Sequence, residues 1–210
     1  MSGAAAVAAG GFPTPSRAAP SPGGWTRSTT QNGFPVIDPT KVDSYPVEGS
    51  GAVVALLPGT VATVLLHVAR RFSYEIDPLG RGDVHGHRTG RYVKAPFESN
   101  QLSGTAIVIR AGRYPIGSAG NLFAAQLLVV RDILAECEGV VRWGGDDPYQ
   151  PKEGHFQIDV APGDPALKRV AAKIGGWRDR PGMGAGSPVD LAQPGRRSAA
   201  RALERRQRPA

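Results

Sequence analysis

The chain has 210 residues, of which 28 are glycine and 19 are proline, and its formal net charge is +7. This length is sufficient for one main domain with a buried core. Residues 176–210 contain eight basic and three acidic residues, whereas residues 51–175 contain fourteen and twelve. Because the excess charge is concentrated near the C-terminus, we do not expect a nucleic-acid-binding face on the folded domain. The single cysteine, Cys137, excludes an intrachain disulfide and a CxxC metal site, and it is expected to be a small buried hydrophobe.

Residues 1–49 are expected to form a flexible arm. Glycine, alanine, proline and serine dominate residues 1–35, and this composition buries too little apolar surface to offset the entropy lost on ordering. The first residues, MSGAAAVAAGG, have no basic group before a short apolar stretch, and no run approaches the roughly 20 apolar residues of a membrane span. Neither export nor membrane insertion is indicated, which leaves the cytoplasm or a phage particle as the expected location.

Residues 50–175 have the pattern of a folded domain. Three runs carry apolar residues at the i, i+3, i+4, i+7 spacing of a helix with one buried face: residues 60–76, 121–137 and 164–174. Short β-like runs lie at residues 52–57, 105–109, 140–143 and 155–160. Because these strands and helices do not alternate regularly, we predict an α+β fold with a small antiparallel sheet and helices packed against it.

Residues 176–210 are expected to form a basic, disordered tail. They are rich in glycine, proline and arginine and end in RRSAARALERRQRPA, which offers no broad apolar face for docking. We therefore expect the tail to be dispensable for folding. Nucleic acid or another anionic polymer is a partner that this chain would bind only through the tail.

Three of the four histidines are candidates for chemistry. His85 and His87 form an HxH pair, whose side chains point the same way on a strand and can chelate a metal ion, although a polar loop is the simpler explanation. His155 begins an apolar strand directly after a turn, where a rigid element presents one side chain to a cleft. His67 lies off the apolar stripe of its helix, so we expect a solvated or half-covered imidazole there.

Two blocks of sequence together resemble a known family. The first, SNQLSGTAIVIRAGRYPIGSAGNLF, runs from Ser99 to Phe123, and the second, VVRWGGDDPYQPKEGHFQIDV, runs from Val140 to Val160. They resemble the zinc D-alanyl-D-alanine carboxypeptidases and L-alanoyl-D-glutamate endopeptidases of bacterial cell walls and phage endolysins. That family has S-N-H-x-S-G-T-A-x-D in the first block, and an acidic residue followed by two further residues and H-F in the second. The resemblance covers roughly residues 50–175 and implies a D-Ala-D-Ala carboxypeptidase-like fold.

The resemblance also implies where a zinc site would lie. In the family a His, an Asp and a second His bind Zn²⁺ and leave the fourth position to water, whose proton passes to an acidic residue. These three ligands fall on Gln101, Val108 and His155 of this chain, so that only His155 is a retained ligand. The general base falls on Lys152, although Glu153 is adjacent. We therefore expect no cofactor, and a catalytically impaired protein.

Two further residues are implied to bind substrate. Arg88 matches the arginine with which the family holds a substrate carboxylate, a role suited to the planar guanidinium. The segment that ends at Asp146 matches the floor of the cleft, although tryptophan followed by a Gly-Gly bend, as in Trp143-Gly144-Gly145, is common in protein cores.

Three functions remain open from the sequence. The preferred one is an impaired peptidase that still recognises a peptidoglycan stem or another peptide. The second is an active zinc peptidase with a rearranged site of His87, His155 and Glu153. The third is a structural module, for example of a phage particle. Zinc content separates the second from the other two, and peptide binding separates the first from the third.

Overall fold

The computed structural model describes residues 23–177, 180 and 182–208. Its centre is a four-stranded antiparallel sheet with the order β4-β6-β8-β7. The strands are β4 (Val84–His85), β6 (Ala106–Ile109), β7 (Val141–Trp143) and β8 (His155–Ile158). The predicted α+β class is therefore confirmed.

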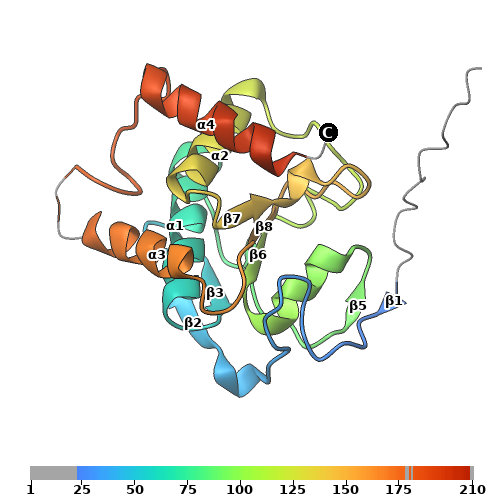
Figure 1. Ribbon diagram of the computed structural model, residues 1–210. Helices are drawn as coiled ribbons and strands as arrows, with labels where there is room; N and C mark the ends of the chain where they lie inside the picture. The colour runs from blue at the N-terminus through green and yellow to red at the C-terminus, as the bar shows by residue number, and fades with distance from the viewer. Residues whose placement is uncertain (1–22, 178–179, 181, 209–210) are drawn as a thin grey trace, which may run out of the picture.

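Helices cover one face of this sheet, and a 3-10 helix with the N-terminal segment lies at the other (Figure 1). The helices are α1 (Thr60–Glu75), α2 (Ala124–Glu136), α3 (Pro165–Trp177) and α4 (Pro194–Gln207), and the 3-10 helix is η2 (Pro96–Ser103). Along β8, Phe156 packs against Phe72 of α1, with their ring centroids 6.3 Å apart. Because side chains alternate along a strand, His155 and Gln157 point to the opposite face, towards η2.

The first three helices agree closely with the periodicity of the sequence. Their inward residues form the main core together with the apolar residues of β6 and β8. Cys137 follows α2 and is fully buried, which raises the pKa of its thiol to about 12 and makes it an inert core residue. No helix in the described ranges is long and apolar enough to span a membrane.

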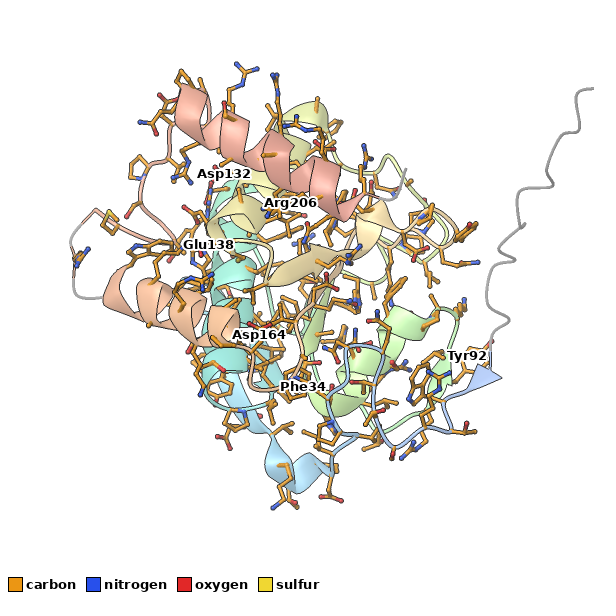
Figure 2. The ribbon with its side chains drawn as sticks, viewed as in Figure 1. Phe34, Tyr92, Asp132, Glu138, Asp164 and Arg206 are labelled. Atoms are coloured by element: carbon orange, nitrogen blue, oxygen red, sulfur yellow. The ribbon has the colours of Figure 1, made fainter. Side chains whose placement is uncertain are left out.

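The prediction that residues 1–49 form a flexible arm is wrong for residues 23–49, and residues 1–22 lie outside the described part. Strand β2 (Asp43–Pro46) pairs with β3 (Val53–Leu56), and short strand β1 (Gly23–Gly24) pairs with β5 (Tyr92–Val93). A one-turn 3-10 helix, η1 (Pro39–Lys41), precedes β2, and Phe34, labelled in Figure 2, is buried as part of the main hydrophobic core. The folded domain therefore begins well before residue 50.

Polar side chains of the SNQLSGT block hold this N-terminal segment in place. The backbone N–H of Gln31 donates to Ser99 Oγ at 2.9 Å, and that of Asn32 donates to Asn100 Oδ1 at 3.1 Å. Gly104 ends η2 in the left-handed conformation, with φ of 65°, and a Cβ there would lie 2.7 Å from the backbone N of Leu57. The block is thus a structural anchor, whatever else it does.

The prediction of a disordered tail is wrong for residues 194–207, which form α4 and pack across α2 (Figure 1). Leu203 of α4 is buried with 4% of its surface exposed, and Gln207 Nε2 donates to the carbonyl oxygen of Val141 at 2.8 Å. One leucine is a weak sequence signal, and polar contacts supply the rest of the docking. Residues 178, 179, 181, 209 and 210 of the expected tail lie outside the described part.

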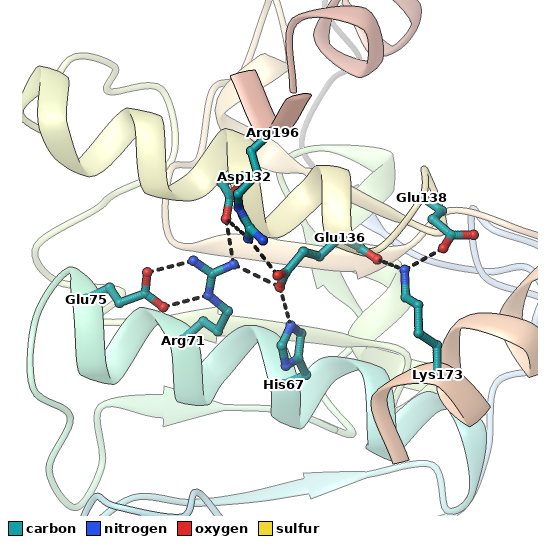
Figure 3. Close-up of polar contacts among 8 residues, drawn as sticks. All are labelled: His67, Arg71, Glu75, Asp132, Glu136, Glu138, Lys173 and Arg196. Carbon is teal, nitrogen blue, oxygen red and sulfur yellow. Dashed lines mark hydrogen bonds and ion pairs between the residues drawn. The ribbon is translucent and has the colours of Figure 1, made fainter. Parts of the chain in front are cut away.

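A buried ionic network joins α4 to the other helices (Figure 3). Arg71 of α1 donates to Asp132 and Glu136 of α2 at 2.7 and 2.8 Å, and Arg196 of α4 binds the same two carboxylates. His67 is part of this network, since its Nε2 lies 3.0 Å from Glu136 Oε2 and its imidazole is buried. Burial lowers the pKa of His67. The expectation of a solvated or half-covered His67 was wrong, because the network covers the side of α1 beyond its apolar stripe and leaves the residue only 1% exposed.

Candidate functional site

The family-like positions lie on the face of the sheet opposite the helices. Val108 of β6 is the direct antiparallel partner of His155 of β8, and His85 of β4 is the partner of Val108 on its other side. Gln101 reaches this row from η2, where its Nε2 donates to the carbonyl oxygen of Gly86 at 2.9 Å. Two segments far apart in sequence, η2 with β6 and the turn into β8, therefore meet at one place.

His155 is fully buried and has a fixed orientation. Its Nε2 lies 3.0 Å from Gln157 Oε1, and its ring centroid is 4.7 Å from that of Phe97. Gln157 in turn donates from Nε2 to Gln31 Oε1 at 3.2 Å, which makes its Oε1 the acceptor for His155 Nε2–H. Burial, with the nearby positive charge of Lys152, lowers the pKa of His155 to about 3. The imidazole is therefore neutral at pH 7.

The other ring nitrogen, His155 Nδ1, is buried and has no hydrogen-bond partner within the described residues. With Nε2–H donated to Gln157, Nδ1 carries a lone pair. Metal-binding histidines have this arrangement, in which one nitrogen is oriented by a hydrogen bond and the other faces the ion. Val108 stands opposite, and its methyl groups supply no ligand.

Lys152 occupies the expected position of the general base and forms a buried ion pair. Its Nζ lies 2.6 Å from Glu98 Oε1, and the backbone N–H of Lys94 donates to the second carboxylate oxygen of Glu98 at 2.8 Å. Burial alone would raise the pKa of Glu98, but the bond to Lys152 outweighs it and the net shift is downward. The position at which the resemblance implies a proton acceptor therefore holds a neutralised cation.

Glu153 faces away from this site. Its two carboxylate oxygens accept hydrogen bonds from the backbone N–H groups of Gly120 and Asn121 at 2.8 and 2.9 Å. Its carbonyl oxygen accepts from Trp143 Nε1 at 2.7 Å. These contacts tie together two loops and the end of β7, so Glu153 has a structural role and is not placed as a base.

The two other histidines of the proposed metal chemistry do not join His155. His87 Nε2 lies 3.3 Å from the carbonyl oxygen of Ile37, and the side chain of His85 is exposed. Within residues 23–177, 180 and 182–208, no three His, Cys, Asp or Glu side chains are grouped so as to hold a metal ion. The structure therefore does not bring together the rearranged set of His87, His155 and Glu153.

Arg88 is half-buried and is bound only by carbonyl oxygens. Its Nη1 donates to Tyr92 O at 2.8 Å and its Nη2 to Glu98 O at 3.4 Å, while its buried Nε has no partner within the described residues. No described carboxylate lies within ion-pair distance of this guanidinium. Burial lowers the pKa of Arg88, partly offset by the charge of Glu98. The arginine is a cation without a direct counter-ion.

Asp146 is not available to a substrate, which corrects the role implied for it by the resemblance. Arg131 binds both of its carboxylate oxygens, at 2.5 and 2.6 Å, and Arg208 adds a contact of 3.0 Å. The guanidinium of Arg131 also stacks 4.9 Å from the ring of Trp143. Asp146 therefore links α2, the end of β7 and the C-terminal segment.

Sequence reasoning did not find Glu98, Gln31 or Gln157. Glu98 directly precedes the SNQLSGT block, and a buried lysine at the base position requires a counter-ion, which is the one signal that would have indicated it. Gln31 and Gln157 lie 126 residues apart, and no local pattern connects them. Comparisons with protein-family models, curated proteins and solved structures give no significant match for this chain.

Proposed function

We propose that this chain is a non-hydrolytic relative of the zinc D-Ala-D-Ala carboxypeptidase and L-alanoyl-D-glutamate endopeptidase family, and that it binds the carboxylate of a peptidoglycan stem or another peptide. The observation that carries the proposal is Arg88, a half-buried guanidinium that donates only to carbonyl oxygens. A desolvated guanidinium without an acidic partner favours an anion, and its planar donors suit a carboxylate.

The charges around Arg88 support an anionic ligand. Lys152 and Glu98 neutralise each other, and His155 is uncharged because its pKa is lowered to about 3. The site therefore retains the single positive charge of Arg88. A peptide carboxylate would neutralise it without competing with an internal ion pair.

The same geometry argues against hydrolysis. At the three ligand positions the chain offers His155 Nδ1, the apolar Val108 and a glutamine amide that is bound to a backbone carbonyl. At the base position it offers the ammonium of Lys152. A water-activating zinc site requires three ligands and a proton acceptor, whereas these residues provide one ligand and no proton acceptor.

Calorimetry with stem peptides tests the proposal. Arg88→Ala should weaken the binding of a peptide with a free C-terminal carboxylate by at least about 2 kcal/mol, which is roughly 30-fold in affinity. This value is the lower end of the range for desolvated charge pairs, because Arg88 is only half-buried. Lys94→Ala is the matched control, since it removes an exposed charge from the same segment. Unchanged affinity in Arg88→Ala, or equal affinity for the C-terminal amide, would show that Arg88 does not read the carboxylate.

A second candidate function is a structural module, which the closed state of the site favours. Glu98, Gln101, Lys152 and His155 are all buried, and Lys152 is the most exposed of them at 9%. The Glu98–Lys152 pair fills the position at which substrate would meet the base. If the unmodified chain binds no stem peptide in the same calorimetry, this second function replaces the first.

A further inference from the structure

Helix α4 presents a row of unpaired arginines to solvent. Arg197, Arg201 and Arg205 are exposed and lie four residues apart. Successive residues of this row are about 6 Å apart along the helix, since each residue rises about 1.5 Å. Among the described residues none of the three has an ion-pair partner.

The direction of this row is fixed by the opposite side of α4. Arg196, Leu203 and Gln207 recur at helical spacing and face α2 and the sheet. Arg196 binds Asp132 at 2.6 Å, an interaction seen in Figure 3. A helix held by buried contacts on one side presents the other side as a preformed surface, with little further loss of entropy on binding.

No acidic residue in the described part of the chain forms an ion pair with the row. Residues 194–208 contain six arginines and one acidic residue, Glu204. The carboxylate of Glu204 lies 3.3 Å from Arg131 and 3.2 Å from Arg208. Asp132, the nearest acid on α2, is already bound by Arg71 and Arg196.

The chemistry of the row selects among anionic partners. An anionic membrane surface requires large apolar residues beside the basic ones. Between these arginines stand serine, alanine, Glu204 and Leu203, and Leu203 is buried against the domain. A helix-binding peptide requires a row of bulky anchors at helical spacing. Beside the arginines, a pocket that Arg197 and Arg201 help to line contains the exposed Leu128 of α2 and the half-buried Leu191, which are too few for such a row. A polyphosphate backbone requires only repeated guanidinium donors, which bind phosphate through two parallel hydrogen bonds.

We infer that the outer face of α4, defined by Arg197, Arg201 and Arg205, binds the phosphate backbone of nucleic acid without reading its sequence. This surface is separate from Arg88 and does not depend on the peptide-binding proposal. Neutralising about three phosphates predicts a slope of roughly −2.7 in a plot of log affinity against log salt concentration.

Fluorescence anisotropy with a labelled DNA duplex and the full chain, at several salt concentrations, tests the inference. The triple variant R197Q, R201Q, R205Q should lose the steep salt dependence, with a slope shallower by about 3 and affinity reduced on the order of 10²-fold at 0.1 M salt. The triple variant R197K, R201K, R205K keeps the charge and should retain the slope. All three positions are exposed, and circular dichroism verifies that each variant is folded.

The matched control removes the same charge elsewhere. Lys41, Arg81 and Lys168 are exposed on other parts of the domain, so K41Q, R81Q, K168Q lowers the net charge equally. Retained DNA affinity in this control, with loss in the α4 variant, supports the inference. Equal loss in both variants, absence of DNA binding at low salt, or equally tight binding of polyglutamate would overturn it.

Discussion

Introducing the zinc ligands that the resemblance implies should convert the chain into a zinc-binding protein. The change is Gln101→His together with Val108→Asp, which adds an imidazole and a carboxylate beside His155. Val108 and His155 are direct partners on antiparallel strands, and such residues have Cβ atoms about 4.5–5.5 Å apart, close enough for both side chains to bind one ion. His155 Nδ1 is buried and unpartnered within the described residues, and so completes a set of two nitrogens and one oxygen.

The magnitude follows from the burial of position 108. Val108 is only 2% exposed, and a carboxylate placed there without metal should cost several kcal/mol of stability. Zinc at a free concentration about 100 times its dissociation constant stabilises the folded chain by about 2.7 kcal/mol, because it binds only the folded state. The double variant should therefore melt below the parent without metal and recover much of the difference with zinc, whereas the parent should not respond.

Zinc per chain, measured by mass spectrometry after dialysis, is the direct assay. The double variant should hold one zinc, and the same variant with His155→Ala should hold none. Hydrolysis of stem peptides needs Lys152→Glu or Lys152→Asp as well, combined with Glu98→Gln so that two carboxylates are not buried together. One zinc in the unmodified chain, lost on His87→Ala, would refute this reasoning and favour the rearranged enzyme.

Two further predictions concern stability. Lys152→Met should lower the free energy of unfolding by about 3–5 kcal/mol at pH 7, because the Glu98 carboxylate remains buried without its partner, and Lys152→Met with Glu98→Gln should restore most of it. Lys152 lowers the folded-state pKa of Glu98, so the stability that the pair contributes is present above the unfolded pKa of about 4.3 and is lost as the pH falls through the lowered value. Urea unfolding should therefore show a smaller difference in stability between the parent and Lys152→Met at pH 4 than at pH 7. An equal difference at the two pH values would count against the pair. Leu203→Ala should cost about 2–3 kcal/mol, because its side chain is buried between α4 and the domain. Deletion from residue 194 onwards should lower the melting temperature further, and an unchanged midpoint in calorimetry would show that α4 does not stabilise the domain.

Local patterns in the sequence determined the elements that bury an apolar face. The predicted helix over residues 60–76 is observed as Thr60–Glu75, and the strand predicted over 155–160 is observed as His155–Ile158. Periodicity predicts such elements because a helix or strand that packs on a core needs its apolar residues on one side. The strand pattern also indicated His155, since the start of a strand after a turn is where a side chain reaches a cleft, whereas Arg88 was indicated only by the resemblance to the peptidase family.

Only the tertiary structure decided the elements that are held by polar contacts. Helix α4 has one buried leucine and docks through Arg196 and Gln207, whose partners lie about sixty residues away in the sequence. The N-terminal segment is held in the same way by side chains of Ser99 and Asn100. Composition treats such residues as solvated, because it cannot identify their partners.

The same limit applied to the site. The resemblance implies zinc ligands at Gln101 and Val108 and a general base at Lys152, and the residue types at these positions are already unsuited to those roles. The pairing of Lys152 with Glu98, the turning of Glu153 towards the backbone of Gly120, and the unpartnered Nδ1 of His155 depended on which strands became neighbours. A sequence fixes which groups carry charge or lone pairs, whereas the distances and desolvation that determine their chemistry arise only when distant segments pack together.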